Sequence, residues 1–248
     1  MSGDLVLLRM LVIAAALPDQ ELWRQAAAMA SVPLDFTAHP PASAAGALAK
    51  DGADICVVDG DLSDADKTAL IAAARALQPA PLVFMAAPQG SARHGRVDGM
   101  LGKPSSADDA RTLVEICVRA KIPSRVLIVD DSGTMRSIVR KILSASRFAL
   151  DIHEVAEGIA ALNQLRGGNF DMVFLDYNMP GLNGFETLAE IKRETPNVAV
   201  VMMTSTVDNA IADRAHAAGV LAFLKKPFYP ADIDRVLERY YSLHVPRG

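Results

Sequence analysis

The sequence predicts an α/β protein with two consecutive domains, each a doubly wound parallel sheet with helices on both faces. The chain has 248 residues, which is enough for two domains of about 120 residues. In both halves, short apolar runs alternate with segments of helical spacing, as in strands joined by crossover helices. The halves also form an internal repeat, because Asp54–Asp59 matches Asp171–Asp176 and Gly102-Lys103-Pro104 matches Lys225-Lys226-Pro227.

The first half starts with an apolar strand and continues as alternating helices and strands. Pro18 starts the first helix, and Ser105 or Ser106 caps the last one. Strands are predicted at Arg9–Ile13, Leu34–Thr37, Asp54–Asp59, Pro81–Ala86 and Val97–Leu101. Helices are predicted at Pro18–Ala30, Pro41–Lys50, Ser63–Leu77 and Ser105–Ala120.

A short break at Lys121–Ser124, which contains Pro123, separates the halves, so we predict domains at residues 1–121 and 122–248. The alternation of strand and helix is predicted five times in each half. In the second half, strands are predicted at Arg125–Val129, Asp151–Val155 (an edge strand), Met172–Asp176, Val198–Met203 and Val220–Leu224. Helices are predicted at Thr134–Ser146, Gly158–Gly167, Phe185–Glu194, Asp208–Ala218 and Pro230–Tyr241.

Composition narrows the classes of function. Hydrophobic residues make up 51% of the chain, and the net charge of −4 does not favour a nucleic-acid surface. No apolar run reaches the roughly 18 residues of a membrane span, and Asp4 in the apolar start argues against a signal peptide. We therefore expect a soluble, cytoplasmic protein without nucleic-acid or membrane partners. Its two cysteines, Cys56 and Cys117, should be buried free thiols.

Acidic residues end two predicted strands of the second half. The strand Met172–Asp176 stops at a carboxylate, and Asp130 and Asp131 follow the strand Arg125–Val129. Parallel strands end at the same edge of a sheet, where ligands bind, so these three acids should be neighbours. Their mutual repulsion would be relieved by Mg²⁺, a hard cation that prefers oxygen ligands.

Two more polar residues are expected at the same edge, the hydroxyl of Thr204 and the ammonium of Lys226. A divalent cation, an ammonium and a hydroxyl together suit a phosphoryl group that passes between two oxygens. On this interpretation Asp176 is the nucleophile and forms an aspartyl phosphate. Each feature alone has a simpler explanation, such as a helix cap or a surface lysine, and only the combination indicates function.

Residues Arg125–His244 resemble the receiver domain of two-component response regulators. The motifs that carry the resemblance are VLIVDDS, FLDYNMPGLNG, MMTS and KKPF, in this order. The resemblance implies a flavodoxin-like (βα)5 fold with strand order 2-1-3-4-5. It also implies that Asp176 accepts a phosphoryl group from a histidine kinase or a phosphotransfer protein, so that the chain is a signalling protein rather than an enzyme.

The resemblance further implies the ligands of Mg²⁺. Asp131 and Asp176 would hold the ion directly, together with the backbone carbonyl of Asn178. Asp130 would act mainly through metal-bound water.

The resemblance also implies how the signal spreads. Lys226 would pair with the phosphoryl oxygens, Thr204 would move toward them, and Phe223 would follow as an aromatic switch. Many members of the family carry tyrosine at this last position, and phenylalanine lacks the hydroxyl for a hydrogen-bonded outward state.

The first half resembles a receiver only in outline. Ala14 and Ala15 stand where the acidic pair should be, and Ala87 replaces the threonine, while Asp59 and Lys103 remain. Six fewer residues separate Ala87 from Lys103 than separate their counterparts in the second half. We therefore expect a short or irregular fourth helix, an ion pair between Asp59 and Lys103, and no phosphorylation of this half.

The expected output is contact with another protein, because little sequence follows the last predicted helix and no DNA-binding domain is apparent. The downstream partner is unknown, and the degenerate half could bind it or form a homodimer. One alternative is a scaffold in which neither half is phosphorylated, or a phosphate sink. Another is a dehalogenase-type phosphatase, but that class needs a second acid where this chain has Asn178.

Overall fold

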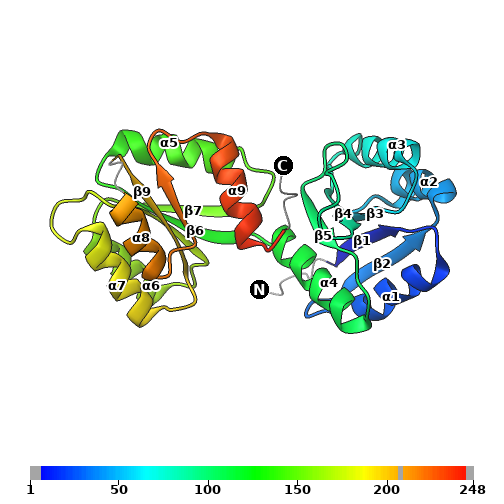
Figure 1. The fold of residues 1–248 in the computed structure, drawn as a ribbon, viewed down its shortest axis with the longest axis horizontal. Helices are drawn as coiled ribbons and strands as arrows, with labels where there is room; N and C mark the ends of the chain where they lie inside the picture. Colours follow the sequence, from blue (N-terminus) through cyan, green and yellow to red (C-terminus); the bar gives the residue numbers. More distant parts are fainter. Residues whose placement is uncertain (1–6, 206–208, 244–248) are drawn as a thin grey trace, which may run out of the picture. The chain divides into compact units, whose positions relative to one another are not determined.

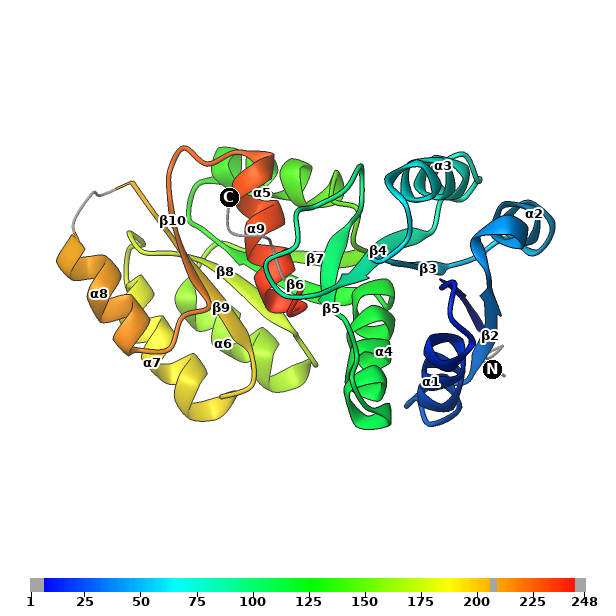
Figure 2. The ribbon, with the colours of Figure 1, turned by 45° about the vertical axis from the view of Figure 1, so that its right-hand side comes forward.

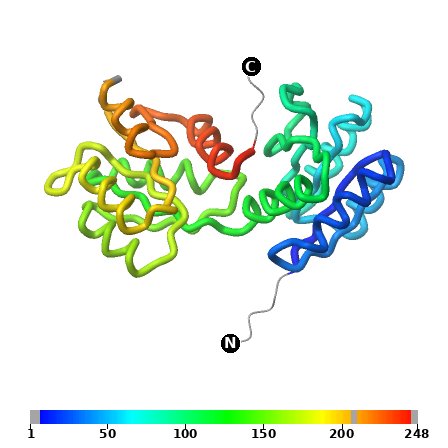
Figure 3. Tube along the Cα trace, turned by 60° about the horizontal axis from the view of Figure 1, so that its bottom comes forward, coloured from blue at the N-terminus to red at the C-terminus, as the bar shows by residue number. Residues whose placement is uncertain are grey.

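The computed structural model describes residues 7–205 and 209–243 and divides the chain into two compact units. Unit 1 comprises Met1–Ile122 and Tyr241–Gly248, and unit 2 comprises Pro123–Tyr240. Figure 1 shows the elements of both units, and Figure 3 traces the chain through unit 1 in blue to green and through unit 2 in green to red. Within the described residues, no helix has the length and apolarity that a membrane crossing requires.

In the described part of unit 1, five parallel strands form a sheet in the order β2-β1-β3-β4-β5. The strands are β1 (Leu8–Ile13), β2 (Leu34–His39), β3 (Ile55–Asp59), β4 (Leu82–Ala87) and β5 (Gly99–Gly102). The helices are α1 (Leu17–Ala28), α2 (Pro41–Asp51), α3 (Asp64–Arg75) and α4 (Ala107–Lys121). Helices α1 and α4 pack together on one face of the sheet, and α2 and α3 on the other (Figure 2).

Unit 1 departs from the predicted alternation of strand and helix between its fourth and fifth strands. The five-fold repeat of strand and helix is wrong here, because residues 88–98 form a loop without a helix between β4 and β5. The six missing residues explain this, and the expected irregular segment is confirmed. Arg75 holds the loop from α3, since its guanidinium lies 2.7 Å from the buried carboxylate of Asp98 and donates to the carbonyl of Arg96.

In the described part of unit 2, five parallel strands form the sheet β7-β6-β8-β9-β10, which is the order 2-1-3-4-5 counted from β6. The strands are β6 (Ser124–Val129), β7 (Leu150–Val155), β8 (Met172–Asp176), β9 (Ala199–Thr204) and β10 (Ala222–Lys225). The helices are α5 (Gly133–Ser144), α6 (Gly158–Gly167), α7 (Gly184–Glu194), α8 (Asn209–Ala217) and α9 (Pro230–Tyr240). The predicted fold class and strand order are confirmed in both units.

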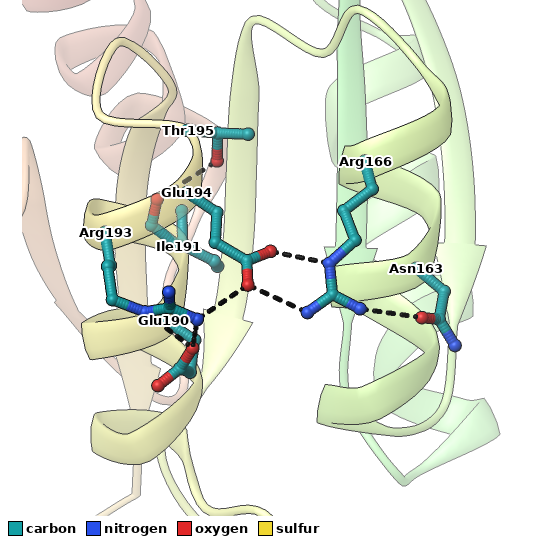
Figure 4. Close-up of polar contacts among 7 residues, drawn as sticks. All are labelled: Asn163, Arg166, Glu190, Ile191, Arg193, Glu194 and Thr195. Atoms are coloured by element: carbon teal, nitrogen blue, oxygen red, sulfur yellow. Dashed lines mark hydrogen bonds and ion pairs between the residues drawn. The ribbon is translucent and has the colours of Figure 1, made fainter.

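Burial explains why the apolar runs of unit 2 become central strands. Every residue of β8 is buried, because sheet neighbours flank it and helices cover both faces, whereas the edge strand β7 is only partly buried. Helices α5 and α9 pack together, as do α6 and α7. Arg166 of α6 donates two hydrogen bonds, of 2.6 and 2.8 Å, to the carboxylate of Glu194 on α7 (Figure 4). This paired geometry fixes the two helices side by side.

Candidate functional site

The acids of unit 2 meet at the carboxyl edge of the sheet. Asp176 is the last residue of β8, and Asp130 follows β6, which pairs with β8 in parallel register up to Val129 and Leu175. Asp130 is 1% exposed and Asp176 is 4% exposed, whereas Asp131 is exposed. Each of the three offers a carboxylate oxygen, and these oxygens lie within 4.8 Å of one another.

Lys226 bridges the two buried acids. It follows β10, and its Nζ donates to Oδ2 of Asp130 at 2.7 Å and to Oδ1 of Asp176 at 2.9 Å. Burial by itself lowers the pKa of Lys226, but the hydrogen bonds to both carboxylates outweigh burial, so this pKa lies above its usual value. Lys226 is therefore a fixed positive charge between the two acids.

The environment of Asp176 disfavours the ionised form of its carboxyl group. Burial raises its pKa above the usual value, and the nearby Asp130 adds to this shift. Hydrogen bonds from Lys226 and from the backbone N–H of Asn178 act in the opposite direction but do not cancel it. One lysine thus compensates two buried carboxylates only in part, and an additional cation would complete the compensation.

The residues present fit Mg²⁺. The donors are all oxygens, which suits a hard cation, and the acidic triad is typical of the Mg²⁺ site of a receiver domain. The three carboxylates open onto a pocket of about 540 Å³, which leaves room for the water ligands that Mg²⁺ retains. Asn178 lines the same pocket, as its predicted role as a carbonyl ligand requires.

Two of the predicted residues, Thr204 and Phe223, are not among the residues that line the pocket. Thr204 ends β9 and is fully buried, but the neighbouring residue that lines the pocket is Ser205. Phe223 lies on β10, opposite Met202 of β9, and packs partly buried against the core of unit 2. The switching roles of Thr204 and Phe223 remain predictions.

Sequence reasoning missed the apolar part of the pocket. Besides the acids and other polar residues, the pocket is lined by Met135, Ile138, Pro227 and Phe228. Met135 and Ile138 lie on α5, and Ile138 is 44% exposed although it belongs to the apolar stripe of that helix. An apolar residue of a helical stripe is normally assigned to the core, so the spacing alone gave no signal of this role.

The corresponding edge of unit 1 has a different chemistry. Lys103 lies 3.5 Å from Oδ1 of Asp59, which confirms the predicted ion pair, and it also binds Asp61 and lies 3.4 Å from Asp19 of α1. The cavity here is only about 10 Å³, lined in part by Trp23. That volume holds about one water molecule, so the site is closed by its own side chains.

Comparisons with known proteins agree with this geometry. Residues 126–238 match the family model of the response regulator receiver domain, which therefore covers only the C-terminal unit. Chemotaxis protein CheY-3 of Vibrio cholerae is 35% identical over 120 residues, which cover 48% of this chain and 92% of the relative. The cyclic di-GMP phosphodiesterase response regulator RpfG of Xanthomonas campestris pv. campestris is 28% identical over 136 residues, 54% of this chain and 36% of RpfG.

One similar solved structure extends over both units. It is described as a probable two-component system response regulator/GGDEF domain protein, and the match covers 95% of this chain and 98% of that chain. The TM-score is 0.55 and the sequence identity is 19%, so this match supports the fold and nothing further.

Proposed function

The chain belongs to the response regulator receiver family, with two receiver domains in tandem, and on this premise we propose that unit 2 accepts a phosphoryl group on Asp176. The observation that supports this most directly is the position of Asp176. It is a buried carboxylate beside Asp130, paired with Lys226, and it lines a pocket with room for a phosphoryl group.

The side chains suggest the following chemistry. A carboxylate oxygen of Asp176 bonds to phosphorus while the bond from phosphorus to the donor breaks, and the donor atom keeps the electron pair. Lys226 is placed to neutralise charge on the transferred oxygens. Mg²⁺, held by Asp131, Asp176 and the carbonyl of Asn178, would supply further charge neutralisation for the phosphoryl group.

The donor we infer is a phosphohistidine of a histidine kinase or of a phosphotransfer protein. Receiver domains interact with histidine kinases, and they are typically phosphoacceptors without a catalytic activity of their own. The readout we infer is contact with another protein, after Thr204 and Phe223 respond to the phosphoryl group.

We further propose that unit 1 is not phosphorylated. Ala14 and Ala15 supply no carboxylate for a metal ion, and Lys103 is already shared among Asp59, Asp61 and Asp19. Asp59 is buried in a site without room for a phosphoryl group. Unit 1 would then act as a binding domain for a partner or for a second copy of the chain.

The test is intact-mass spectrometry after incubation with Mg²⁺ and acetyl phosphate. Wild type and Asp59→Asn should each gain one phosphoryl group, and Asp176→Asn should gain none. A phosphoryl group that depends on Asp59 would contradict the assignment of unit 1. If wild type binds Mg²⁺ but gains no phosphoryl group, the result would instead favour the non-phosphorylated scaffold.

A further inference from the structure

Asp130 has a partner for every polar atom that it carries. Its N–H donates to the carbonyl of Val155 at 3.3 Å, and its Oδ1 accepts from the N–H of Ser132 at 2.9 Å. Its Oδ2 accepts from Lys226, as described above. Its carbonyl oxygen accepts from a guanidinium N–H of Arg136 at 2.7 Å. The first three contacts follow from the sheet, the turn and the site, whereas the fourth comes from a residue that the proposed chemistry does not use.

Asp131, the next residue, is in the opposite situation. It is exposed, and in the described part of the chain no hydrogen bond or ion pair holds its carboxylate. Its backbone therefore sets the direction of its Cα–Cβ bond, and no contact in the described part of the chain restricts its rotamer. The carbonyl of Asp130 and the N–H of Asp131 belong to one planar peptide group, so a bond to that carbonyl fixes the plane from which Asp131 projects.

We propose that Arg136 is a positioning residue that aims Asp131 at the cation by holding this peptide plane. The inference rests on the proposed function, because Asp131 needs a fixed direction only if it binds a metal ion. Arg136 suits this role because its rigid planar fork can bind two acceptors in a set geometry.

The second acceptor of Arg136 anchors it to the sheet. Its Nε donates to Oε2 of Glu154 at 3.3 Å, and Glu154 lies on β7, opposite Ile128 of β6. The side chains of Arg136 and Glu154 are 22% and 25% exposed, so solvent competes only in part for this pair. A chain of contacts thus runs from the edge strand through Glu154 and Arg136 to the peptide before Asp131.

The same helix offers a matched control. Arg140, one turn further along α5, also binds the carboxylate of Glu154. Its second contact, however, goes to the carbonyl of Ile152 at 3.1 Å rather than to Asp130. Replacing Arg140 therefore disturbs the same ion-pair cluster without touching the peptide at the site.

The experiment is a titration of the full chain with MgCl₂, followed by NMR at the amides of Asp130 and Asp131, for wild type, Arg136→Lys and Arg140→Lys. Both substitutions keep the charge, but lysine lacks the fork. Arg136→Lys should weaken Mg²⁺ binding on the order of 10-fold, as is typical for partners of metal ligands. Arg140→Lys should stay within about 2-fold of wild type, since its second contact goes elsewhere.

A second readout separates positioning from general loss of stability. With acetyl phosphate, Arg136→Lys should need more Mg²⁺ for its half-maximal phosphorylation rate but reach the wild-type rate when Mg²⁺ saturates. Glu154→Gln, which frees Arg136, should shift Mg²⁺ binding in the same direction. A purely structural role would lower the unfolding temperature of the arginine variants and leave their Mg²⁺ affinity unchanged.

Wild-type affinity in Arg136→Lys, or an equal loss in Arg140→Lys, would overturn the inference while leaving the phosphoacceptor role of Asp176 intact. Failure of wild type to bind Mg²⁺ at all would overturn both.

Discussion

Asp176 is a residue whose environment suits its proposed chemistry better than it suits the stability of the fold. Burial and the nearby Asp130 raise its pKa above the ordinary value of 3.8, so folding disfavours the ionised form. Above pH 3.8 the unfolded chain gains more from ionising this group than the folded chain does, so the destabilising contribution of Asp176 grows as the pH rises through its folded pKa.

Asp176→Asn should therefore stabilise unit 2 when Mg²⁺ is absent. An amide keeps an acceptor for Lys226 but removes the buried charge, and we expect a gain of about 0.5–2 kcal/mol at neutral pH. Thermal unfolding in EDTA measures the gain, which should shrink toward pH 3.8. Added Mg²⁺ should raise the unfolding temperature of wild type and leave that of Asp176→Asn almost unchanged. A less stable Asp176→Asn in EDTA would show that the carboxylate is well compensated already.

The two cysteines should be unreactive in the folded chain. Both are free and fully buried, as predicted, and burial raises the pKa of Cys56 to about 12 and that of Cys117 further. Cys56 is then a thiolate in only about one molecule in ten thousand at pH 8, so a disulfide reagent should label neither thiol until the chain unfolds. Rapid labelling of native protein would contradict this.

Some residues of the site could be predicted from the sequence, and others could not. Asp130, Asp131, Asp176 and Lys226 could be predicted because each follows directly from a strand end, and parallel strands bring their ends together. Arg136 could not be predicted, because a basic residue on an amphipathic helix is normally solvated. Its contact with a carbonyl depends on rotamer and on the turn geometry, which periodicity does not specify.

At the scale of elements, the two units diverge most between their fourth and fifth strands. Unit 2 has α8 there, and unit 1 has the loop 88–98. Counting residues predicted that the helix would be irregular, but the count could not show what replaces it. The loop that takes the place of the helix is held by the buried carboxylate of Asp98. This carboxylate lies 2.7 Å from the guanidinium of Arg75 on α3 and accepts from the N–H of Val83 on β4 at 2.7 Å.

Asp98→Ala should destabilise unit 1 by roughly 3 kcal/mol, because it removes a buried carboxylate that accepts from the N–H of Val83 and pairs with the partly exposed Arg75. Denaturant unfolding followed by tryptophan fluorescence reports on unit 1 alone, since Trp23 of α1 is the single tryptophan of the chain. Asp108→Ala is the matched control, because this acid is exposed on the first turn of α4 in the same unit. Equal small effects for both would show that the loop does not depend on Asp98.

At the scale of the whole molecule, one strand order carries two different sites. The order 2-1-3-4-5 brings an acid and a lysine together in both units, because both ends are fixed by the sheet. The sheet does not determine whether the site is open. In unit 2 the acids face a pocket of about 540 Å³, whereas in unit 1 the cavity at the corresponding place is only about 10 Å³ and is lined in part by Asp19, Trp23 and Lys103. The architecture could therefore be predicted from the alternation of strands and helices. Whether each site is open or closed depends on a few side chains, which this alternation does not specify.

Unit 1 also contains residues that follow unit 2 in the sequence. The alternation of strands and helices did not predict this. Among the described residues, Tyr241–Leu243 group with unit 1, and Leu243 is only 4% exposed. Its side chain lies against Gly99 of β5 so closely that a methyl group on Gly99 would be 2.9 Å from Cδ1 of Leu243. The sheet of unit 1 thus uses a glycine to admit a side chain that follows unit 2 in the sequence.

Leu243→Ala should therefore destabilise unit 1, although residue 243 lies more than a hundred residues beyond its last helix. A buried leucine replaced by alanine typically costs roughly 2–5 kcal/mol through lost contacts and the cavity that remains. Unfolding followed by the fluorescence of Trp23 should show this loss, whereas Leu17→Ala, at a leucine that is 76% exposed on α1, should change little. If both variants matched wild type, the tail would not contribute to the stability of unit 1. A loss specific to Leu243 would mean that unit 1 reaches full stability only after unit 2 has been synthesised, because the residue that completes its packing comes last.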